Sequence, residues 1–244
     1  SVDLDIMLAG KSCFDDALQV LTKAGFELVS MKTGLSGILK KIYIEAKREM
    51  VFMNRQKNIV VDLHLKPSPN SYFSSSRFRD FLKNTEFFDL EGISVPILPP
   101  ERYLVFLCHH AALHQFSRLG WLNDIRSFLK VVKPDLSETI KVARRTGTEI
   151  GFFTAMLLVK RIFGEEIPEM KLNRQESINA EKLAFASVKL LNRDSGFLMS
   201  FFRGRLFRLR YLIKLNRDLP GKIDVFTGLL LRMLVKSYRH SGSI

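Results

Sequence analysis

The sequence contains little cysteine and no long hydrophobic run. Its two cysteines, Cys13 and Cys108, form neither a CxxC pair nor a set with metal-ligand spacing, so a disulfide or zinc framework is not expected. The first residues show no charged segment followed by an apolar one, as a secretory signal would. The longest apolar run, residues 150–159, is too short to span a bilayer and is bounded by Glu149 and Lys160. We therefore expect a soluble, cytoplasmic protein without a transmembrane segment.

Acidic residues are in the minority. Lysine and arginine number 38 against 25 aspartates and glutamates, which gives a net charge of +13. The excess is uneven, since residues 199–244 hold ten basic residues and two aspartates. A basic surface attracts polyanions such as nucleic acid, nucleotide phosphates or acidic membrane, although a solvated helix face on a basic protein gives the same composition. Recurrence at helical spacing predicts one basic stripe, formed by Arg203, Arg210, Lys214 and Arg217.

The apolar content is high enough for a folded protein. Hydrophobic residues make up 46% of the chain, and 20 of them are phenylalanine, which excludes a disordered chain. Strand-like patterns dominate up to Leu98, and almost only helical patterns follow the prolines at 96, 99 and 100. We therefore predict an α+β fold with an α/β domain at residues 1–98 and an all-helical domain at 99–244.

The predicted elements follow from hydrophobic period, caps and turn residues. Helices are expected at 12–24, 77–83, 101–116, 119–132, 136–146, 149–163, 178–192, 199–215 and 223–239. Strands are expected at 1–8, 26–32, 40–46, 49–54 and 58–66, with a hairpin at 87–98 and a loop of proline and serine at 67–76.

The first strand carries two carboxylates. Because alternate side chains of a strand point to opposite faces, Asp3 and Asp5 share one face, while Val2, Leu4 and Ile6 fill the other. Neighbouring carboxylates repel each other unless a cation lies between them. Two interpretations follow: a divalent metal site with hard oxygen ligands, or a half-exposed edge strand with two solvated acids.

A second acidic strand occurs at residues 59–65. Asp62 and His64 share one face of it with Val60. A carboxylate within an apolar strand is costly unless it is paired or metal-bound. If this strand lies beside the first, Asp62 joins Asp3 and Asp5, and three carboxylates hold two metals roughly 4 Å apart. The third also accepts a proton from an attacking hydroxyl. His64 either orients a carboxylate or substrate, or is a hydrogen-bonded structural residue.

These motifs resemble a known superfamily. Val2-Asp3-Leu4-Asp5, a helix, further strands and then Val61-Asp62-Leu63-His64 are similar to the nucleotidyltransferases of DNA polymerase beta type. More narrowly, the chain resembles a bacterial family of uncharacterised nucleotidyltransferases, whose acidic strands are followed by a helical segment with paired histidines. Here that segment is His110-Ala111-Ala112-Leu113-His114. The resemblance is good over about residues 1–130 and loose over the remainder.

The resemblance implies a fold, a reaction and a site. The fold is a small mixed β-sheet core with flanking helices, followed by a helical half. The reaction is transfer of NMP from an NTP to an acceptor hydroxyl or phosphate, with release of pyrophosphate. Asp3, Asp5 and Asp62 are the implied catalytic residues and ligands of Mg²⁺ or Mn²⁺. The acceptor stays open among a small molecule, a protein side chain, a tRNA end and a sugar phosphate.

One element of the superfamily would precede this chain. A Gly-Ser or Gly-Gly turn that binds the triphosphate comes shortly before the D-x-D strand, and here the strand begins at Ser1. We expect that the full protein has residues before Ser1. The alternative function is a non-catalytic module of the same fold, which binds a protein or nucleic-acid partner through the basic C-terminal helices.

The paired histidines have several interpretations. His110 and His114 are four residues apart and project from one helix face, and Arg118 follows one turn later if the helix continues. They are candidates for binding nucleotide phosphates or the acceptor, or for a polar seam between the two halves. A zinc site is disfavoured because no HExxH glutamate or third ligand is near. Asp124, in the stripe of Trp121, is expected to pair with one of these cations.

Overall fold

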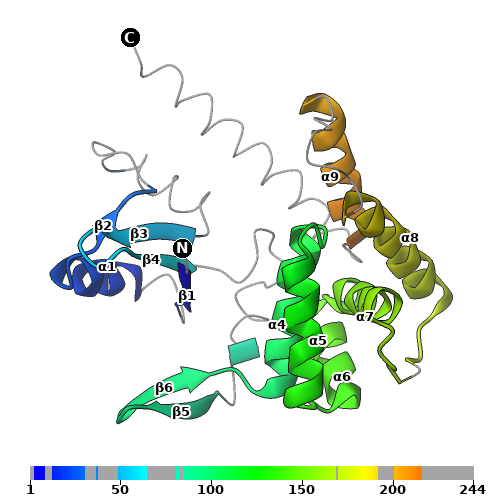
Figure 1. The fold of residues 1–244 in the computed structure, drawn as a ribbon, viewed down its shortest axis with the longest axis horizontal. Coiled ribbons are helices and arrows are strands. Elements are labelled where there is room, and N and C mark those ends of the chain that lie inside the picture. Colours follow the sequence, from blue (N-terminus) through cyan, green and yellow to red (C-terminus); the bar gives the residue numbers. More distant parts are fainter. Residues whose placement is uncertain are drawn as a thin grey trace. The chain divides into compact units, whose positions relative to one another are not determined.

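The computed structural model describes residues 3–8, 13–30, 37, 49–64, 81–82, 85–168, 170–191 and 201–215, and the side chains of Asp3, Glu49 and residues 201–207 lie outside this description. The elements, in chain order, are β1 (Asp3–Met7), α1 (Phe14–Lys23), β2 (Glu27–Leu28), β3 (Glu49–Asn54), β4 (Ile59–His64), β5 (Glu86–Leu90), β6 (Ile93–Ile97), α4 (Pro100–Leu113), α5 (Leu119–Val131), α6 (Leu136–Thr146), α7 (Glu149–Phe163), α8 (Arg174–Leu191) and α9 (Phe201–Leu215) (Figure 1). The predicted α+β class is confirmed, with helices throughout the C-terminal part.

The chain forms two compact units. The described residues up to His64 belong to the first unit, and those from Phe81 onward belong to the second. The hairpin of β5 and β6 therefore groups with the helices. The domain boundary between residues 98 and 99 stays a prediction, and the expected elements at 40–46, 67–76 and 223–239 lie outside the described residues.

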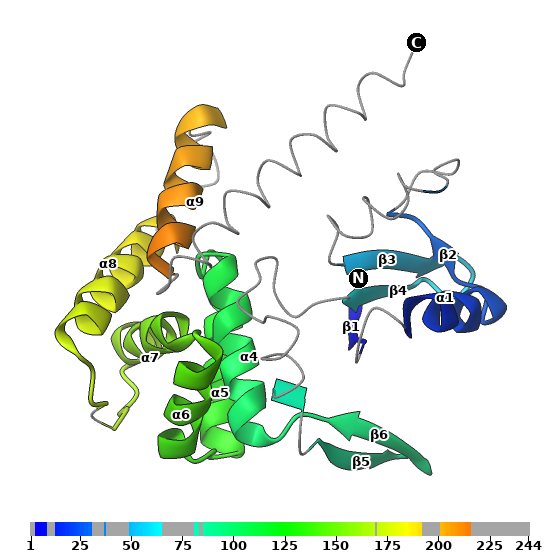
Figure 2. The same ribbon diagram turned by 180° about the vertical axis from the view of Figure 1, so that it is seen from behind.

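The first unit is built on a four-stranded sheet in the order β1-β4-β3-β2. β1 pairs with β4 in parallel, and the other two pairs are antiparallel. β4 is thus an inner strand, hydrogen-bonded on both sides, while β1 is at an edge. Figure 2 shows α1 beside this sheet.

The two faces of the sheet differ in character. Phe14 of α1 packs with Met50, Phe52, Val61 and Leu63 in one buried cluster. These strand residues pair across β3 and β4, Met50 with Leu63 and Phe52 with Val61, so they lie on one face. Because side chains alternate along a strand, the residues between them point away from α1.

β2 is shorter than the strand predicted at 26–32. It covers only Glu27 and Leu28, although the pairing continues as a hydrogen bond from the Val29 amide to the Val51 carbonyl. The Val51 amide instead donates to the hydroxyl oxygen of Ser30, at 3.0 Å. A side chain thus replaces the backbone acceptor there, which ends the regular ladder.

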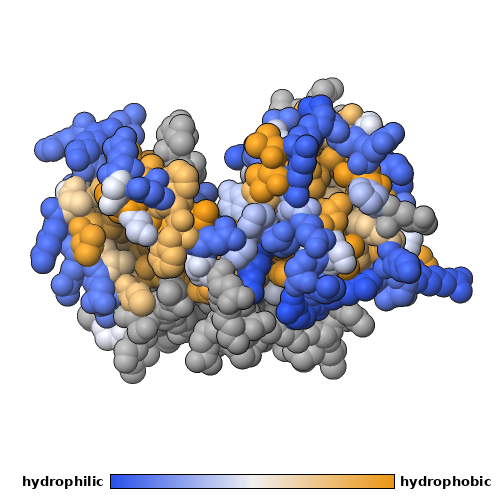
Figure 3. Space-filling view, turned by 90° about the horizontal axis from the view of Figure 1, so that it is seen from below, coloured by the Kyte–Doolittle hydropathy of each residue, from blue (hydrophilic) through white to orange (hydrophobic). Residues whose placement is uncertain are grey.

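The hairpin of β5 and β6 exposes apolar side chains. Its turn contains Glu91 and Gly92, both with positive φ, as the predicted hairpin requires. The side chains of Phe87 and Ile93 are 70% and 66% exposed. Phe88, Leu90 and Ile97 of the same hairpin are exposed as well, at 54%, 55% and 41%. On the face drawn in Figure 3, hydrophobic residues are interspersed with hydrophilic ones.

The core of the second unit lies between α4 and α7. α7 is apolar on most of its circumference, and its residues from Glu149 to Met156 are all buried. Gly151 allows close approach, since a Cβ atom added there would lie 3.1 Å from the Cβ of Ala112 in α4 and 3.4 Å from a methyl carbon of Leu215. Among the described helices, none is long and apolar enough to cross a membrane.

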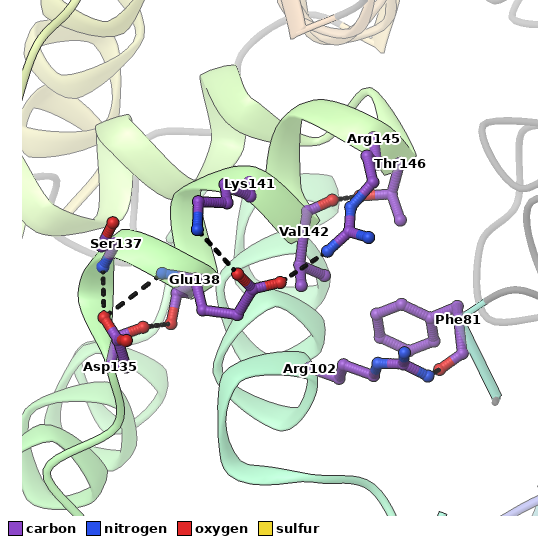
Figure 4. A network of polar contacts seen from close by, with 10 residues as sticks. Phe81, Arg102, Asp135, Ser137, Glu138, Lys141, Val142, Arg145 and Thr146 are labelled. Atoms are coloured by element: carbon purple, nitrogen blue, oxygen red, sulfur yellow. Dashed lines mark hydrogen bonds and ion pairs between the residues drawn. The ribbon is translucent and has the colours of Figure 1, made fainter. Parts of the chain in front are cut away.

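α6 shows how side chains fix helix ends in this unit. The Asp135 carboxylate accepts hydrogen bonds from the amides of Ser137 and Glu138, at 2.8 and 3.3 Å (Figure 4). Gly147 ends the helix in the left-handed conformation, with φ of 73°. An aspartate cap and a glycine stop explain why the predicted bounds 136–146 are confirmed.

Two other helices differ from prediction. α8 begins at Arg174, four residues before the expected start. There, the Asn173 side chain accepts a hydrogen bond from the Glu176 amide, and the Glu176 carboxylate accepts one from the Asn173 amide, both at 2.9 Å. This reciprocal capping box starts the helix. α4 ends at Leu113 rather than at 116, because Gln115 and Phe116 adopt positive φ values of 61° and 50°.

Candidate active site

Two carboxylates are aligned on neighbouring strands of the first unit. In the parallel pair of β1 and β4, Asp5 is in register with Asp62, and Asp3 is in register with Val60. Residues in register on adjacent strands point to the same side of a sheet. Asp5 and Asp62 therefore share the face opposite the buried cluster of α1. The sequence left open whether the two acidic strands are neighbours, and this pairing shows that they are.

His64 contacts one of these carboxylates. Its Nε2 atom lies 2.8 Å from Oδ1 of Asp5, and the histidine side chain is 14% exposed while that of Asp5 is 61% exposed. His64 lies two residues after Asp62 in β4, so it points to the same face. In this hydrogen bond the Nε2–H group of His64 donates and the carboxylate oxygen of Asp5 accepts. This contact leaves the second Asp5 oxygen available to a ligand and fixes the orientation of the carboxylate.

The donor set fits a divalent cation. Asp5 and Asp62 supply hard oxygen ligands from two adjacent strands, and like charges in this arrangement are stabilised by a cation between them. Carboxylates that bind a metal are usually hydrogen-bonded to an outer-shell partner, and Asp5 has such a contact with His64. Within the described side chains, no group of three metal-ligating residues occurs; the side chain of Asp3, the third member expected from the sequence, is outside that set.

The edge position of β1 changes one expectation. Leu4 and Ile6 were expected to fill the apolar face of the sheet. They are 54% and 38% exposed, because α1 packs over β3 and β4 and the edge strand has a neighbour on one side only. The edge position and the partial exposure of β1 agree with the half-exposed edge strand that was one alternative for the sequence, while the divalent metal site stays a prediction.

A second set of side chains gathers in the helical unit. The rings of His110, on α4, and of His114, the C-cap residue of that helix, have centroids 4.9 Å apart. Trp121 of α5 lies 4.9 Å from His114 and 5.8 Å from His110. The Arg118 guanidinium lies over the Trp121 ring, 5.3 Å from its centroid. We call His110, His114, Arg118 and Trp121 the histidine–tryptophan cluster.

Arg118 reaches this cluster by a different route from the one expected. α4 ends at Leu113, so Arg118 is not on its next turn; it is the N-cap residue of α5, with extended backbone. The expectation for Asp124 is wrong. Asp124 is exposed, because it lies on the outer side of α5 while Leu122 and Ile125 of the same helix are buried.

The cluster is electrostatically positive. The pKa of His114 is lowered to about 4, because part of the ring is buried and because His110, Arg208 and Arg118 add positive charge nearby. Arg208 is on α9, so a third helix contributes to the cluster. Adjacent His109 is 1% exposed, and burial together with His110 lowers its pKa to about 3.

A comparison with known families identifies the chain. Residues 1–164 match the family model described as uncharacterised nucleotidyltransferase. This chain belongs to that family. No curated protein and no solved structure matches the chain. The family resemblance predicted from the acidic strands and the paired histidines is therefore confirmed.

The nucleotidyltransferase match includes both sets of side chains. The aligned Asp5 and Asp62 and the histidine–tryptophan cluster lie within residues 1–164, while Arg208 lies beyond the matched part. Sequence reasoning identified the carboxylates and the histidines but assigned no role to Trp121 or to Arg208 specifically. Trp121 follows Arg118 by three residues at the start of a helix, which is a recognisable spacing; the approach of α9 has no local signal.

Proposed function

We propose that this chain is a metal-dependent nucleotidyltransferase that moves NMP from an NTP to an acceptor hydroxyl or phosphate and releases pyrophosphate. The observation that supports the proposal is the register of β1 and β4, which aligns Asp5 with Asp62 on one face of the sheet. Membership of a nucleotidyltransferase family supports the same reaction class. The residues before 65 would form the catalytic part.

In this proposal Asp3, Asp5 and Asp62 hold Mg²⁺ or Mn²⁺. Held there, the metal would neutralise phosphate charge and favour in-line displacement at phosphorus. His64 donates to Asp5 and keeps that carboxylate in one rotamer, so the oxygen that faces the ligand has a fixed direction. Because His64 touches a carboxylate rather than the reacting atoms, it is a positioning residue.

The reaction is a displacement at the α-phosphorus of the NTP. The acceptor oxygen forms a new bond to this phosphorus while the bond to the bridging oxygen breaks, and pyrophosphate carries away the electron pair. Asp62 accepts the proton of an attacking hydroxyl. Its position on the inner strand β4 suits this role, since the strand is hydrogen-bonded on both sides and holds the side chain rigidly.

Calorimetric titration of the whole protein with Mg-NTP, together with an assay of pyrophosphate release, tests the proposal. We expect binding that requires the metal. Asp5→Asn and Asp62→Asn should reduce it, and the transfer rate should fall on the order of a hundredfold or more. Asp16→Asn is the matched control, because Asp16 is an exposed aspartate in the first turn of α1. Metal-independent binding, or full activity in both site variants, would overturn the proposal.

A second candidate is a non-catalytic module that binds a polyanionic partner through α9. The exposure of Arg208, Arg210 and Lys214 supports it, because none of these three forms an ion pair with a described carboxylate. Retention on a polyanion resin that falls with salt, and that is lost when Arg208 and Arg210 are both changed to glutamine, would support this candidate. Retention without any metal-dependent NTP binding would favour it over the enzyme.

A further inference from the structure

The arginines of the helical unit fall into two groups. Four of those with described side chains pair with a glutamate, as Arg126 does with Glu165 and Arg144 does with Glu176. Arg118 and Arg208 belong to the other group. Within the described part of the chain neither pairs with a carboxylate, and both are exposed. The Arg118 guanidinium lies over the Trp121 ring of the cluster, and the charge of Arg208, on α9, also acts on the ring of His114.

The surroundings of these guanidinium groups are aromatic. His114 is exposed and lies 4.9 Å from the half-buried Trp121, at an interplanar angle of 40°. His110 meets the same indole edge to face. Aromatic rings next to unpaired arginines are typical of surfaces that bind nucleotides, because the ring stacks on a base while the guanidinium binds phosphate oxygens.

We propose that the histidine–tryptophan cluster together with Arg208 is a binding site for a phosphorylated nucleoside. Arg118 and Arg208 bind the phosphate, and the rings of the exposed His114 and the half-buried Trp121 contact the base. The phosphate belongs either to a free nucleotide or to a strand of nucleic acid, and the chemistry recognised is the same. The site lies wholly in the helical unit, so the inference does not depend on the proposed transfer reaction at Asp5 and Asp62.

The electrostatics of His114 agree with this assignment. Its pKa is lowered to about 4 by partial burial and by the charges of His110, Arg208 and Arg118. The ring is therefore neutral at neutral pH, so it can stack on a base without repelling the two neighbouring arginines. A phosphate bound between the two arginines would offset their charge. The pKa of His114 would then rise toward its ordinary value, which gives a signature that a purely structural cluster would not show.

The composition of the chain provides a direct probe. Trp121 is the single tryptophan of the chain, so tryptophan fluorescence reports on this site alone. The whole protein, in EDTA, is titrated with ADP, with a single-stranded oligonucleotide of about eight nucleotides and with inorganic pyrophosphate. EDTA removes the divalent metal that the carboxylate site requires, and Asp5→Asn should leave the fluorescence titration unchanged. Failure of the transfer proposal and failure of this one are thus separate results.

We expect ADP or the oligonucleotide to change the fluorescence and to raise the pKa of His114 in an NMR titration. Changing both Arg118 and Arg208 to glutamine should weaken binding roughly tenfold or more, since each loses a charge-assisted hydrogen bond. Arg174→Gln is the matched control, because Arg174 is an exposed arginine without a described carboxylate partner. Tighter binding of ADP identifies a free nucleotide as the source of the phosphate, and tighter binding of the oligonucleotide identifies nucleic acid.

Three results would overturn the inference. The first is no fluorescence change with either nucleotide probe. The second is unchanged affinity in the double arginine variant, with circular dichroism confirming its fold. The third is pyrophosphate binding as tightly as both nucleotide probes, which would mean that the rings do not contact a base.

Discussion

The Nε2 atom of His64 lies 2.8 Å from Oδ1 of Asp5, across two strands that pair in parallel. The contact joins a histidine side chain that is 14% exposed to a carboxylate that is 61% exposed. A side chain that is mostly open to solvent samples several rotamers. Metal binding restricts it to one of them, which costs conformational entropy. The histidine restricts Asp5 before any ligand arrives.

Replacement of His64 tests this positioning role. In His64→Leu the donor is lost, and we expect Mn²⁺ affinity to fall by about 10- to 100-fold, as for other outer-shell partners. His64→Gln keeps an N–H donor at a similar reach and should retain most of the affinity. Electron paramagnetic resonance of free Mn²⁺ measures both. Equal affinity in His64→Leu and the wild type would show that Asp5 needs no orientation by this residue.

The contact between α4 and α7 makes a second prediction. An added methyl group at Gly151 would meet Ala112 at 3.1 Å, in a fully buried helix pair that has little room to move. Gly151→Ala should therefore lower the free energy of unfolding by about 1–3 kcal/mol. Gly120→Ala is the control, because nothing lies within 4 Å of a Cβ atom there; on α5 it should be neutral or stabilising by up to about 1 kcal/mol. Urea denaturation of both variants decides the matter, and equal effects would refute the close packing.

The cap of α6 gives a third prediction. Asp135→Ala removes the acceptor for the amides of Ser137 and Glu138, and we expect a loss of about 1 kcal/mol in the free energy of unfolding. Asp124→Ala changes an exposed aspartate within α5 and should stay within about 0.5 kcal/mol of the wild type. Thermal denaturation compares the two. A large loss in Asp124→Ala would mean that this carboxylate has a partner after all.

Buried His109 makes stability depend on pH. Its pKa in the folded protein is lowered to about 3, from an ordinary value of 6.5. Between these two values the unfolded chain binds a proton that the folded chain does not, so protonation favours the unfolded state. The free energy of unfolding should therefore fall as the pH decreases from 6.5 toward 3, by at most about 1.4 kcal/mol per pH unit from this group.

Denaturation of His109→Gln at several pH values checks the prediction. Other groups also titrate in this range, so the informative quantity is the difference in the free energy of unfolding between wild type and variant. The free energy of unfolding of the variant should depend less on pH than that of the wild type. A second variant, His109→Leu, guards against a local effect of the glutamine amide. Identical pH profiles in the wild type and both variants would show that the native ring takes up its proton near its ordinary pKa.

Much of the fold could be predicted because its signals are local. The alternation of Val61, Asp62, Leu63 and His64 places two apolar residues against α1 and two polar ones on the other face, as the structure shows. The helices of the second unit follow the helical period closely, and Asp135 and Gly147 mark both ends of α6. The start of α8 was predicted four residues too late, because the Asn173 and Glu176 pair was not recognised as a capping box.

Other features depend on contacts that the sequence does not encode locally. The left-handed Gln115 and Phe116 end α4 without a glycine or proline, so a periodic pattern extends past the true end. The exposure of Leu4 depends on the position of β1 at the sheet edge, which is a matter of topology. Arg208 influences His114 only because α9 approaches α4 in three dimensions. These are tertiary relationships, and no window along the sequence contains both partners.

The parallel pairing of β1 with β4 has a consequence for the order of folding. β3 and β4 are joined by the short turn at residues 55–58 and form by local zippering, which is fast. Asp5 and His64 are 59 positions apart, and bringing β1 to β4 requires closure of that long loop, which is slower. The aligned carboxylates should thus come together after the hairpin exists. Pulse-labelling hydrogen exchange would then show the amides of β4 that face β3 protected earlier than the amide of Leu8, which bonds the His64 carbonyl.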